Sequence, residues 1–219
     1  GFTGHDWVVE SGARLVEVMD LGFNPVRLAA AVPEGFSEDE ARRRRLIVAT
    51  EYETIAGLFL AGRRFDAVIL RTFGATEVFP PDDADMIVDN VSTGRTLRAH
   101  SLSLYAEILR STTRLVADPA ALRDSWKRER IEETALLLRG VLDARNRVML
   151  EMNVPAERLD GIVALLPCLR SPTVSPLFAG RGYAVKAAVP RAESARLIPL
   201  LKKAGAGDIL EYEFGKVIL

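Results

Sequence analysis

Several features that this 219-residue chain lacks already exclude some classes of protein. Cys168 is its one cysteine, so the chain cannot form an internal disulfide, which indicates a reducing compartment. No apolar run reaches the roughly 20 residues of a membrane-spanning helix, and no stretch has the pattern of a signal peptide. We therefore expect a cytoplasmic protein without a membrane partner.

The chain also lacks an excess of either charge, since 29 basic and 30 acidic residues give a net charge of -1. This balance provides no overall field for nucleic acid or for an anionic membrane, so neither is expected as a partner. What the chain does have is a composition of 48% hydrophobic and 27% charged residues. Such a composition, at this length, suits a globular protein with one or two hydrophobic cores.

Short apolar runs alternate with helix-like pieces in the first half of the chain. The runs at residues 45–50, 67–70 and 86–89 predict strands, and residues 54–64 predict a helix. Buried strands separated by helices are typical of βαβ units, so we expect a mostly parallel sheet. The arginine-rich run at 41–46 predicts a solvated loop, and a phosphate-binding patch is the less favoured interpretation.

The middle of the chain predicts one long helix at residues 117–145. Asp118 suits the N-cap, and Pro119 suits the first helical position. One apolar face recurs at helical spacing. Its members are Ile131, Ala135, Leu138 and Leu142.

A faint internal repeat follows residue 147. Residues 147–167 and 183–212 each consist of a strand, a Val-Pro pair and a helix, with Pro155 and Pro190 at matching places. Two such halves predict a small ferredoxin-like domain.

The loop after the strand at 86–89 is rich in side chains that can bind a ligand. It holds Ser92, Thr93, Gly94, Arg95 and Thr96. Backbone N–H groups at a strand–loop–helix turn can hold a phosphate, and a glycine allows the positive φ that such a turn needs. Asp89, just before the loop, can accept hydrogen bonds from sugar hydroxyls. The alternative is an ordinary strand–helix turn with a Ser/Thr cap.

Residues 85–102, "DMIVDNVSTGRTLRAHSL", closely resemble the phosphoribosyl diphosphate loop of ATP phosphoribosyltransferase, the first enzyme of histidine biosynthesis. Other segments resemble the same family in the same order. They are "GFTGHDWVVESGA" (1–13), "LIVATEY" (46–52), "FGATEV" (73–78) and, for the regulatory domain of the long form, residues 149–177.

This resemblance implies an α/β fold with two catalytic lobes of the periplasmic-binding-protein type, followed by a ferredoxin-like, ACT-like regulatory domain. The expected parts are 1–27 as the remainder of lobe I, 28–110 as lobe II with the phosphate loop, 111–144 as the return to lobe I with the long helix, and 145–219 as the histidine-binding domain.

The implied reaction transfers the phosphoribosyl group of phosphoribosyl diphosphate to ATP and yields phosphoribosyl-ATP and pyrophosphate. The resemblance also implies Mg²⁺ as the cofactor, L-histidine as a feedback inhibitor, and a homo-oligomer between dimer and hexamer. A transition state of oxocarbenium character is expected at the anomeric carbon.

The resemblance also implies roles for particular residues. The 5-phosphate would be cradled by Ser92, Thr93, Gly94, Arg95 and Thr96. Asp89 would face the ribose hydroxyls, and Asp6 and Glu77 are the other catalytic candidates, with no general base assigned and no metal ligand identified. Trp7 would lie beside Asp6 on the nucleotide side. Histidine would be bound near Asn153, Leu169, Thr173, Ala188 and Asp208.

The sequence departs from the family's pattern in its first residues. His5 stands where the family has arginine, and the family's opening strand and its basic "PKGR"-like motif have no counterpart here. We therefore expect an N-terminally truncated copy that need not be active alone. One alternative is a catalytically impaired chain that serves only to bind histidine, since fold alone does not give function. Another is a different phosphoribosyltransferase, although such enzymes usually have two adjacent acidic residues where Asp89 is followed here by Asn90.

Overall fold

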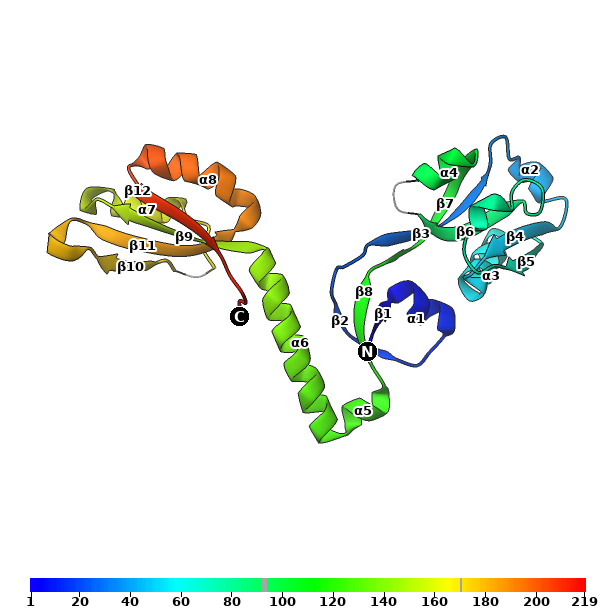
Figure 1. The fold of residues 1–219 in the computed structure, drawn as a ribbon, viewed down its shortest axis with the longest axis horizontal. Helices are drawn as coiled ribbons and strands as arrows, with labels where there is room; N and C mark the ends of the chain where they lie inside the picture. Colours follow the sequence, from blue (N-terminus) through cyan, green and yellow to red (C-terminus); the bar gives the residue numbers. More distant parts are fainter. Residues whose placement is uncertain (92–93, 170) are drawn as a thin grey trace. The chain divides into compact units, whose positions relative to one another are not determined.

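The structure is a computed structural model that describes residues 1–91, 94–169 and 171–219. Residues 1–131 and 132–219 form two compact units (Figure 1). Within the described residues, no helix is long and apolar enough to cross a membrane.

The smaller sheet of the first unit has the order β1-β8-β2, with all pairings antiparallel. Its strands are β1 (Phe2–Gly4), β2 (Val16–Asp20) and β8 (Thr113–Ala117). Because β8 is inserted between β1 and β2, the chain returns late to the sheet that it began. Helix α1 (His5–Ser11) follows β1 directly and ends at Gly12, which has the left-handed φ of 60° that suits glycine at this position.

The larger sheet has the order β5-β4-β6-β3-β7. Its strands are β3 (Val26–Pro33), β4 (Leu46–Thr50), β5 (Ala67–Arg71), β6 (Met86–Val91) and β7 (Leu102–Ser111). The predicted parallel pairing is confirmed for β4 with β5 and β6, but β3 is antiparallel to both β6 and β7. The prediction of a mostly parallel sheet is therefore wrong for this half of the sheet. The reason is topological, because β3 brings the chain in from β2 and β7 leads it back to β8.

Both faces of this sheet are covered, which explains its nearly continuous apolar strands. One face packs Leu28, Val48 and Met86 with α3 (Glu53–Arg63), and the other packs Ile87 and Leu97 on the side of α4 (Arg95–Ala99). The parallel strands β4, β5 and β6 therefore end at one edge of the sheet, where a site is expected.

The arginine-rich run follows the short helix α2 (Glu38–Ala41) and is exposed, as predicted. Arg42 pairs with Glu38 at 2.5 Å, and Arg44 pairs with Asp85 at 2.6 Å. The guanidinium groups of Arg42 and Arg44 are therefore both paired with carboxylates.

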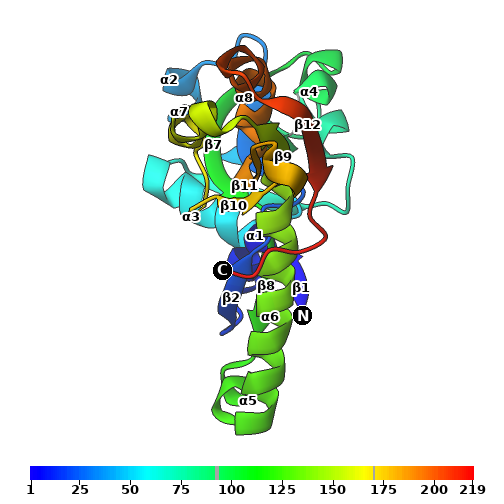
Figure 2. The same ribbon diagram turned by 90° about the vertical axis from the view of Figure 1, so that its left-hand side faces the viewer.

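The predicted single helix at 117–145 is wrong in one respect, because it is broken at Asp124. Helix α5 (Pro119–Arg123) is followed by a separate α6 (Ser125–Arg145), as Figures 1 and 2 show. Asp124 has an extended ψ of 120°, and its carboxylate accepts from the Lys127 N–H at 3.0 Å, so it caps a new helix. The predicted N-cap at Asp118 is confirmed, since its carboxylate accepts from the Ala120 N–H at 2.6 Å.

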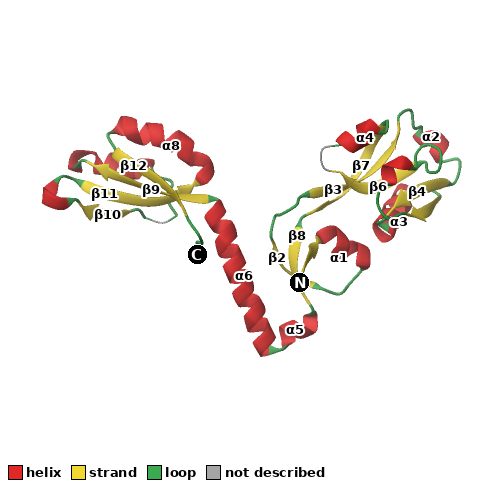
Figure 3. Ribbon diagram, in the orientation of Figure 1, coloured by secondary structure: helices red, strands yellow, loops and turns green. Residues whose placement is uncertain are grey.

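The second unit has the ferredoxin-like fold that the repeat predicts. Its sheet has the order β10-β11-β9-β12, and all its pairings are antiparallel. Figure 3 shows α7 and α8 on one face of this sheet, where Ile162 and Leu197 join the core. The elements are β9 (Arg147–Val154), α7 (Leu159–Leu165), β10 (Thr173–Pro176), β11 (Tyr183–Pro190), α8 (Arg191–Ala204) and β12 (Gly207–Glu213), with short 3₁₀ turns at Ala156–Arg158 and Phe178–Gly180.

Candidate active site

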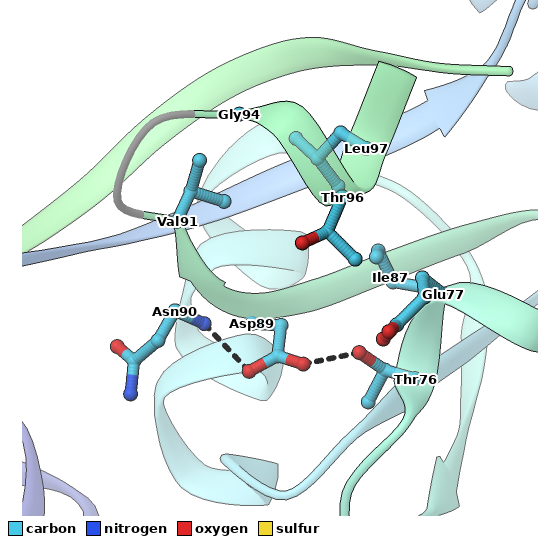
Figure 4. Close-up of a pocket in the computed structure, with 9 residues that line it drawn as sticks. All are labelled: Thr76, Glu77, Ile87, Asp89, Asn90, Val91, Gly94, Thr96 and Leu97. Atoms are coloured by element: carbon cyan, nitrogen blue, oxygen red, sulfur yellow. Dashed lines mark hydrogen bonds between the residues drawn. The ribbon is translucent and has the colours of Figure 1, made fainter. Parts of the chain in front are cut away.

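A cavity of about 270 Å³ opens at the carboxyl end of β6 (Figure 4). Three elements supply its walls: the end of β6, the 3₁₀ turn η1 (Thr76–Val78) and the start of α4. Its described lining residues are Thr76, Glu77, Ile87, Asp89, Asn90, Val91, Gly94, Thr96 and Leu97. Four of the predicted site residues therefore meet here, namely Glu77, Asp89, Gly94 and Thr96.

The carboxylate of Asp89 is held in place by its neighbours. The Thr76 hydroxyl donates to one oxygen, and the Asn90 backbone N–H donates to the other at 2.6 Å (Figure 4). Thr76 is itself fully buried, so its hydroxyl has little freedom to turn away. Asp89 is thereby presented to the cavity in one orientation, as a residue that receives a sugar hydroxyl should be.

Gly94 occupies the N-cap of α4 with a φ of 68°, in the left-handed region that favours glycine. Buried Leu97 ties this short helix to the core, and Thr96 reaches the cavity. Arg95 is exposed and is not among the cavity residues. Ser92 and Thr93, which the sequence assigned to the phosphate, lie outside the described residues.

Glu77 brings a second carboxylate to the same cavity (Figure 4). Ala75, at the entry of its turn, has a left-handed φ of 51°. Among the described residues there is no group of three or more His, Cys, Asp or Glu side chains that could hold a metal ion. Asp89 and Glu77 together provide two carboxylates, a number that suits a Mg²⁺ ion carried largely by substrate phosphates.

Asp6 does not line this cavity and is connected to it through Tyr52. Its carboxylate is only 3% exposed and accepts from the Tyr52 hydroxyl at 3.0 Å and from the Ser111 hydroxyl at 2.7 Å. The Tyr52 oxygen accepts in turn from the Asn90 side-chain amide at 2.5 Å. Trp7 lies with its ring centroid 5.0 Å from that of Tyr52 and is 44% exposed.

The Tyr52 hydroxyl stays protonated in this setting. Burial raises the pKa of Tyr52, and the charge of Asp6 and the hydrogen bond to it raise it further. Since its one proton goes to Asp6, Tyr52 can only accept from Asn90, which settles the orientation of the Asn90 amide. The segment "LIVATEY" contains Tyr52, but its sequence does not reveal this role, since only the fold brings the start of α3 together with β6 and α1.

His5, which replaces the family's arginine, has a local partner. Its Nδ1 lies 2.6 Å from a carboxylate oxygen of Glu17 on β2. His5 begins α1 and is not among the residues that line the cavity.

A second cavity, of about 490 Å³, shares Val91 with the first and was not predicted. Three arginines on β3, β7 and β8 line it: Arg27, Arg110 and Arg114. Arg110 pairs with Glu107 at 2.6 Å, and Arg114 pairs with Asp20 at 2.6 Å. Arg27 is far in sequence from Arg110 and Arg114, so no local motif identified the three together.

The predicted histidine-binding residues fall into two groups in the second unit. Leu169, Thr173 and Ala188 line a cavity of about 350 Å³. Asn153 and Asp208 are not among its lining residues, and they join β9 to β12 through an Nδ2–Oδ2 hydrogen bond of 2.8 Å.

Comparison with known proteins shows to which family this chain belongs. The ATP phosphoribosyltransferase family model matches residues 1–140, and the model of the HisG C-terminal domain matches residues 144–216. The chain belongs to the ATP phosphoribosyltransferase family. Over its whole length it is 42% identical to the ATP phosphoribosyltransferase of Chlorobium phaeovibrioides and 41% identical to that of Desulforudis audaxviator. It covers 76% and 78% of those two proteins.

A solved structure supports the same family. An ATP phosphoribosyltransferase chain from the HisG:HisZ complex of Thermotoga maritima matches with a TM-score of 0.55 and 27% identity. The match covers 62% of this chain and 65% of that one. Membership in the ATP phosphoribosyltransferase family confirms the predicted activity, the first step of histidine biosynthesis. It excludes the alternative of a different phosphoribosyltransferase, because both parts of the chain match the same family.

Proposed function

We propose that the cavity at the end of β6 is where this chain transfers the phosphoribosyl group of phosphoribosyl diphosphate to ATP. One observation carries the proposal: in a chain of this family, Asp89, Glu77, Gly94 and Thr96 line a single cavity. In this assignment the 5-phosphate lies against Gly94 and Thr96. Ser92 and Thr93, which the resemblance assigns to the same phosphate, lie outside the described residues. The ribose hydroxyls face Asp89.

The reaction forms a bond between a ring nitrogen of adenine and the anomeric carbon of the ribose, while the bond from that carbon to pyrophosphate breaks. Positive charge develops on the ribose as pyrophosphate leaves. The carboxylate of Asp89 is already oriented by Thr76, so it can stabilise that charge without first turning. No general base is assigned, because positioning and electrostatics can supply most of this catalysis.

Asp6 and Trp7 are assigned to the nucleotide side with different roles. Asp6 is buried and hydrogen-bonded, so in this proposal it acts through Tyr52 and Asn90 as a positioning residue. The exposed face of Trp7 is a suitable surface for the adenine ring.

Mg²⁺ would be held by Asp89 and Glu77 together with the substrate's phosphates. When bound, it supplies positive charge that neutralises the departing diphosphate.

Regulation and assembly are also part of the proposal. Histidine would inhibit the enzyme from the second unit, where Leu169, Thr173 and Ala188 line the cavity of about 350 Å³. Assembly into a homo-oligomer of two to six chains follows the family expectation, and the Thermotoga relative occurs in a complex. The lone Cys168 supports a reducing, cytoplasmic setting.

The test is a transfer assay on the complete protein with ATP, phosphoribosyl diphosphate and Mg²⁺, in which phosphoribosyl-ATP and pyrophosphate are measured together. Gly94→Val should raise the KM for phosphoribosyl diphosphate at least about tenfold, because a β-branched residue cannot adopt a φ of 68° without strain. Gly62→Ala in α3 is the matched control, since a Cβ there meets nothing within 4 Å. Unchanged substrate affinity in Gly94→Val would refute the loop assignment. A folded wild-type protein that binds histidine without transferring would favour the impaired regulatory chain.

A further inference from the structure

Residues 217–219 follow β12 and lie against α6 in the second unit. The Val217 N–H donates to the Gly140 carbonyl oxygen at 2.9 Å. In Figure 2 this red segment passes across α6, in agreement with that hydrogen bond. The contact joins residues far apart in sequence, and nothing in the local pattern of either segment predicts it.

Gly140 is what permits this contact. A Cβ at this position would lie 2.4 Å from Ile218 Cδ1 and 3.3 Å from the Val217 carbonyl oxygen. Glycine is, after proline, the least favourable residue in a helix interior, and α6 continues to Arg145. The helix therefore accommodates an unfavourable residue at the one turn where segment 217–219 approaches it. By contrast, a Cβ at Gly161 in α7 of the same unit would meet nothing within 4 Å.

Segment 217–219 also borders the proposed histidine cavity. Ile218 and Leu219 line the same cavity of about 350 Å³ as Leu169, Thr173 and Ala188. Both side chains remain substantially exposed, at 54% and 69%. They are therefore apolar surfaces at the edge of a cavity, and a ligand bound there would remove part of them from water.

The remaining walls of the cavity suit an amino acid. Lys186 is the only charged side chain among its described lining residues, and its ammonium already pairs with Glu151 at 3.1 Å. Ser171 and Thr173 bring hydroxyl groups. An ammonium group beside hydroxyls can receive the carboxylate of an amino acid, while Met149 and Leu169 offer apolar contact to its side chain.

We propose that segment 217–219 is a wall of the effector site, and that its close seat on α6 at Gly140 is what places Ile218 and Leu219 at the cavity. The inference rests on the proposed inhibition by histidine and adds to it the residues that complete the site. A ligand bound in the cavity covers part of the exposed Ile218 and Leu219 side chains. Occupancy of the cavity is thereby coupled to the helix through which the chain passes from residues 1–131 to 132–219.

The experiment is calorimetric titration of L-histidine into the complete protein and its Gly140→Ala variant. The added Cβ displaces segment 217–219, so histidine affinity should fall about tenfold, the amount expected from losing part of one apolar side-chain contact. The basal transfer rate and the helical content should stay unchanged. Gly161→Ala should bind histidine as the wild type does, which controls for the general effect of alanine in a helix.

A second variant keeps the inference testable if Gly140→Ala folds poorly. Ile218→Ser changes an exposed side chain and should weaken histidine binding while the melting temperature stays within about 2 °C of the wild type.

The outcomes separate this inference from the proposed function. Wild-type affinity in both Gly140→Ala and Ile218→Ser would overturn the role of segment 217–219 and leave histidine regulation intact. A wild-type protein that transfers but binds no histidine would overturn the effector assignment, and this inference with it, while the transfer function stands.

Discussion

Replacing Tyr52 by phenylalanine tests the connection between Asp6 and the cavity most directly. The change removes a hydroxyl that donates at 3.0 Å to a carboxylate only 3% exposed. A hydrogen bond to a buried charged group contributes about 1.5–3 kcal/mol, so we expect the first unit to lose about 2 kcal/mol of stability. Asn90 is exposed and can turn to water, so its amide adds little to this loss. In this variant the Asn90 side-chain amide no longer has the Tyr52 hydroxyl to hold it. We expect this to lower kcat more than it raises the KM for either substrate.

The assay follows unfolding of the first unit through Trp7, which stacks on Tyr52. A Trp126→Phe background leaves Trp7 as the one tryptophan of the chain, because the sequence contains two. A loss of 2 kcal/mol should lower the melting temperature by about 4–8 °C. Tyr105→Phe is the matched control, since its hydroxyl donates at 2.7 Å to Glu38, which is far less buried than Asp6, and its removal should cost less than about 1 kcal/mol. If Tyr52→Phe unfolds within about 0.5 kcal/mol of the wild type, the proposed coupling through this hydroxyl is wrong.

Other predictions concern the orientation of Asp89 and the acid stability of the fold. Thr76→Val keeps the buried shape but removes the donor to Asp89, so kcat should fall about tenfold or more, and steady-state kinetics with an unchanged kcat would contradict this. Burial opposes ionisation of Asp85, but the Arg44 hydrogen bond and the Ile47 N–H outweigh it and lower the pKa of Asp85 below its ordinary 3.8. Its stabilisation is therefore present above pH 3.8 and is lost as the pH falls through the lower folded-state value. Asp85→Asn should melt below the wild type at pH 7, and the gap should narrow on acidification below pH 4. A gap that does not change with pH would exclude this linkage.

Local patterns predicted much of the first unit because they act over a few residues. The apolar runs that became β4, β5 and β6 were recognisable without a partner, and β4 and β6 lie largely buried while β5 forms the partly exposed edge of the sheet. The direction of β3 was not predictable in this way, since a strand's sequence carries little information about which neighbour it pairs with. The break at Asp124 was missed because Asp124 lies within a continuous helical pattern, and its capping of Lys127 becomes evident only in the folded chain.

Some residues of the candidate site were predicted from the sequence, and others were found only in the structure. The sequence identified Asp89, Gly94 and Thr96 because they lie within one short segment, residues 89–96. It identified Glu77 because Glu77 belongs to a segment that resembles the family. It did not reveal that Tyr52 links Asp6 to Asn90. Asp6 lies on α1, Tyr52 at the N-cap of α3 and Asn90 on β6, so their contact depends on how these elements pack.

By itself, the sequence determined the family, the phosphate loop and the ferredoxin-like repeat. Each of these features depends on the order of neighbouring residues, which is the same in the unfolded and the folded chain. Only the tertiary structure decided the antiparallel pairing of β3, the buried position of Asp6 and the approach of Ile218 to Gly140. These features are contacts between residues distant in sequence. Their geometry depends on shape and burial, which come into being only when the whole chain packs.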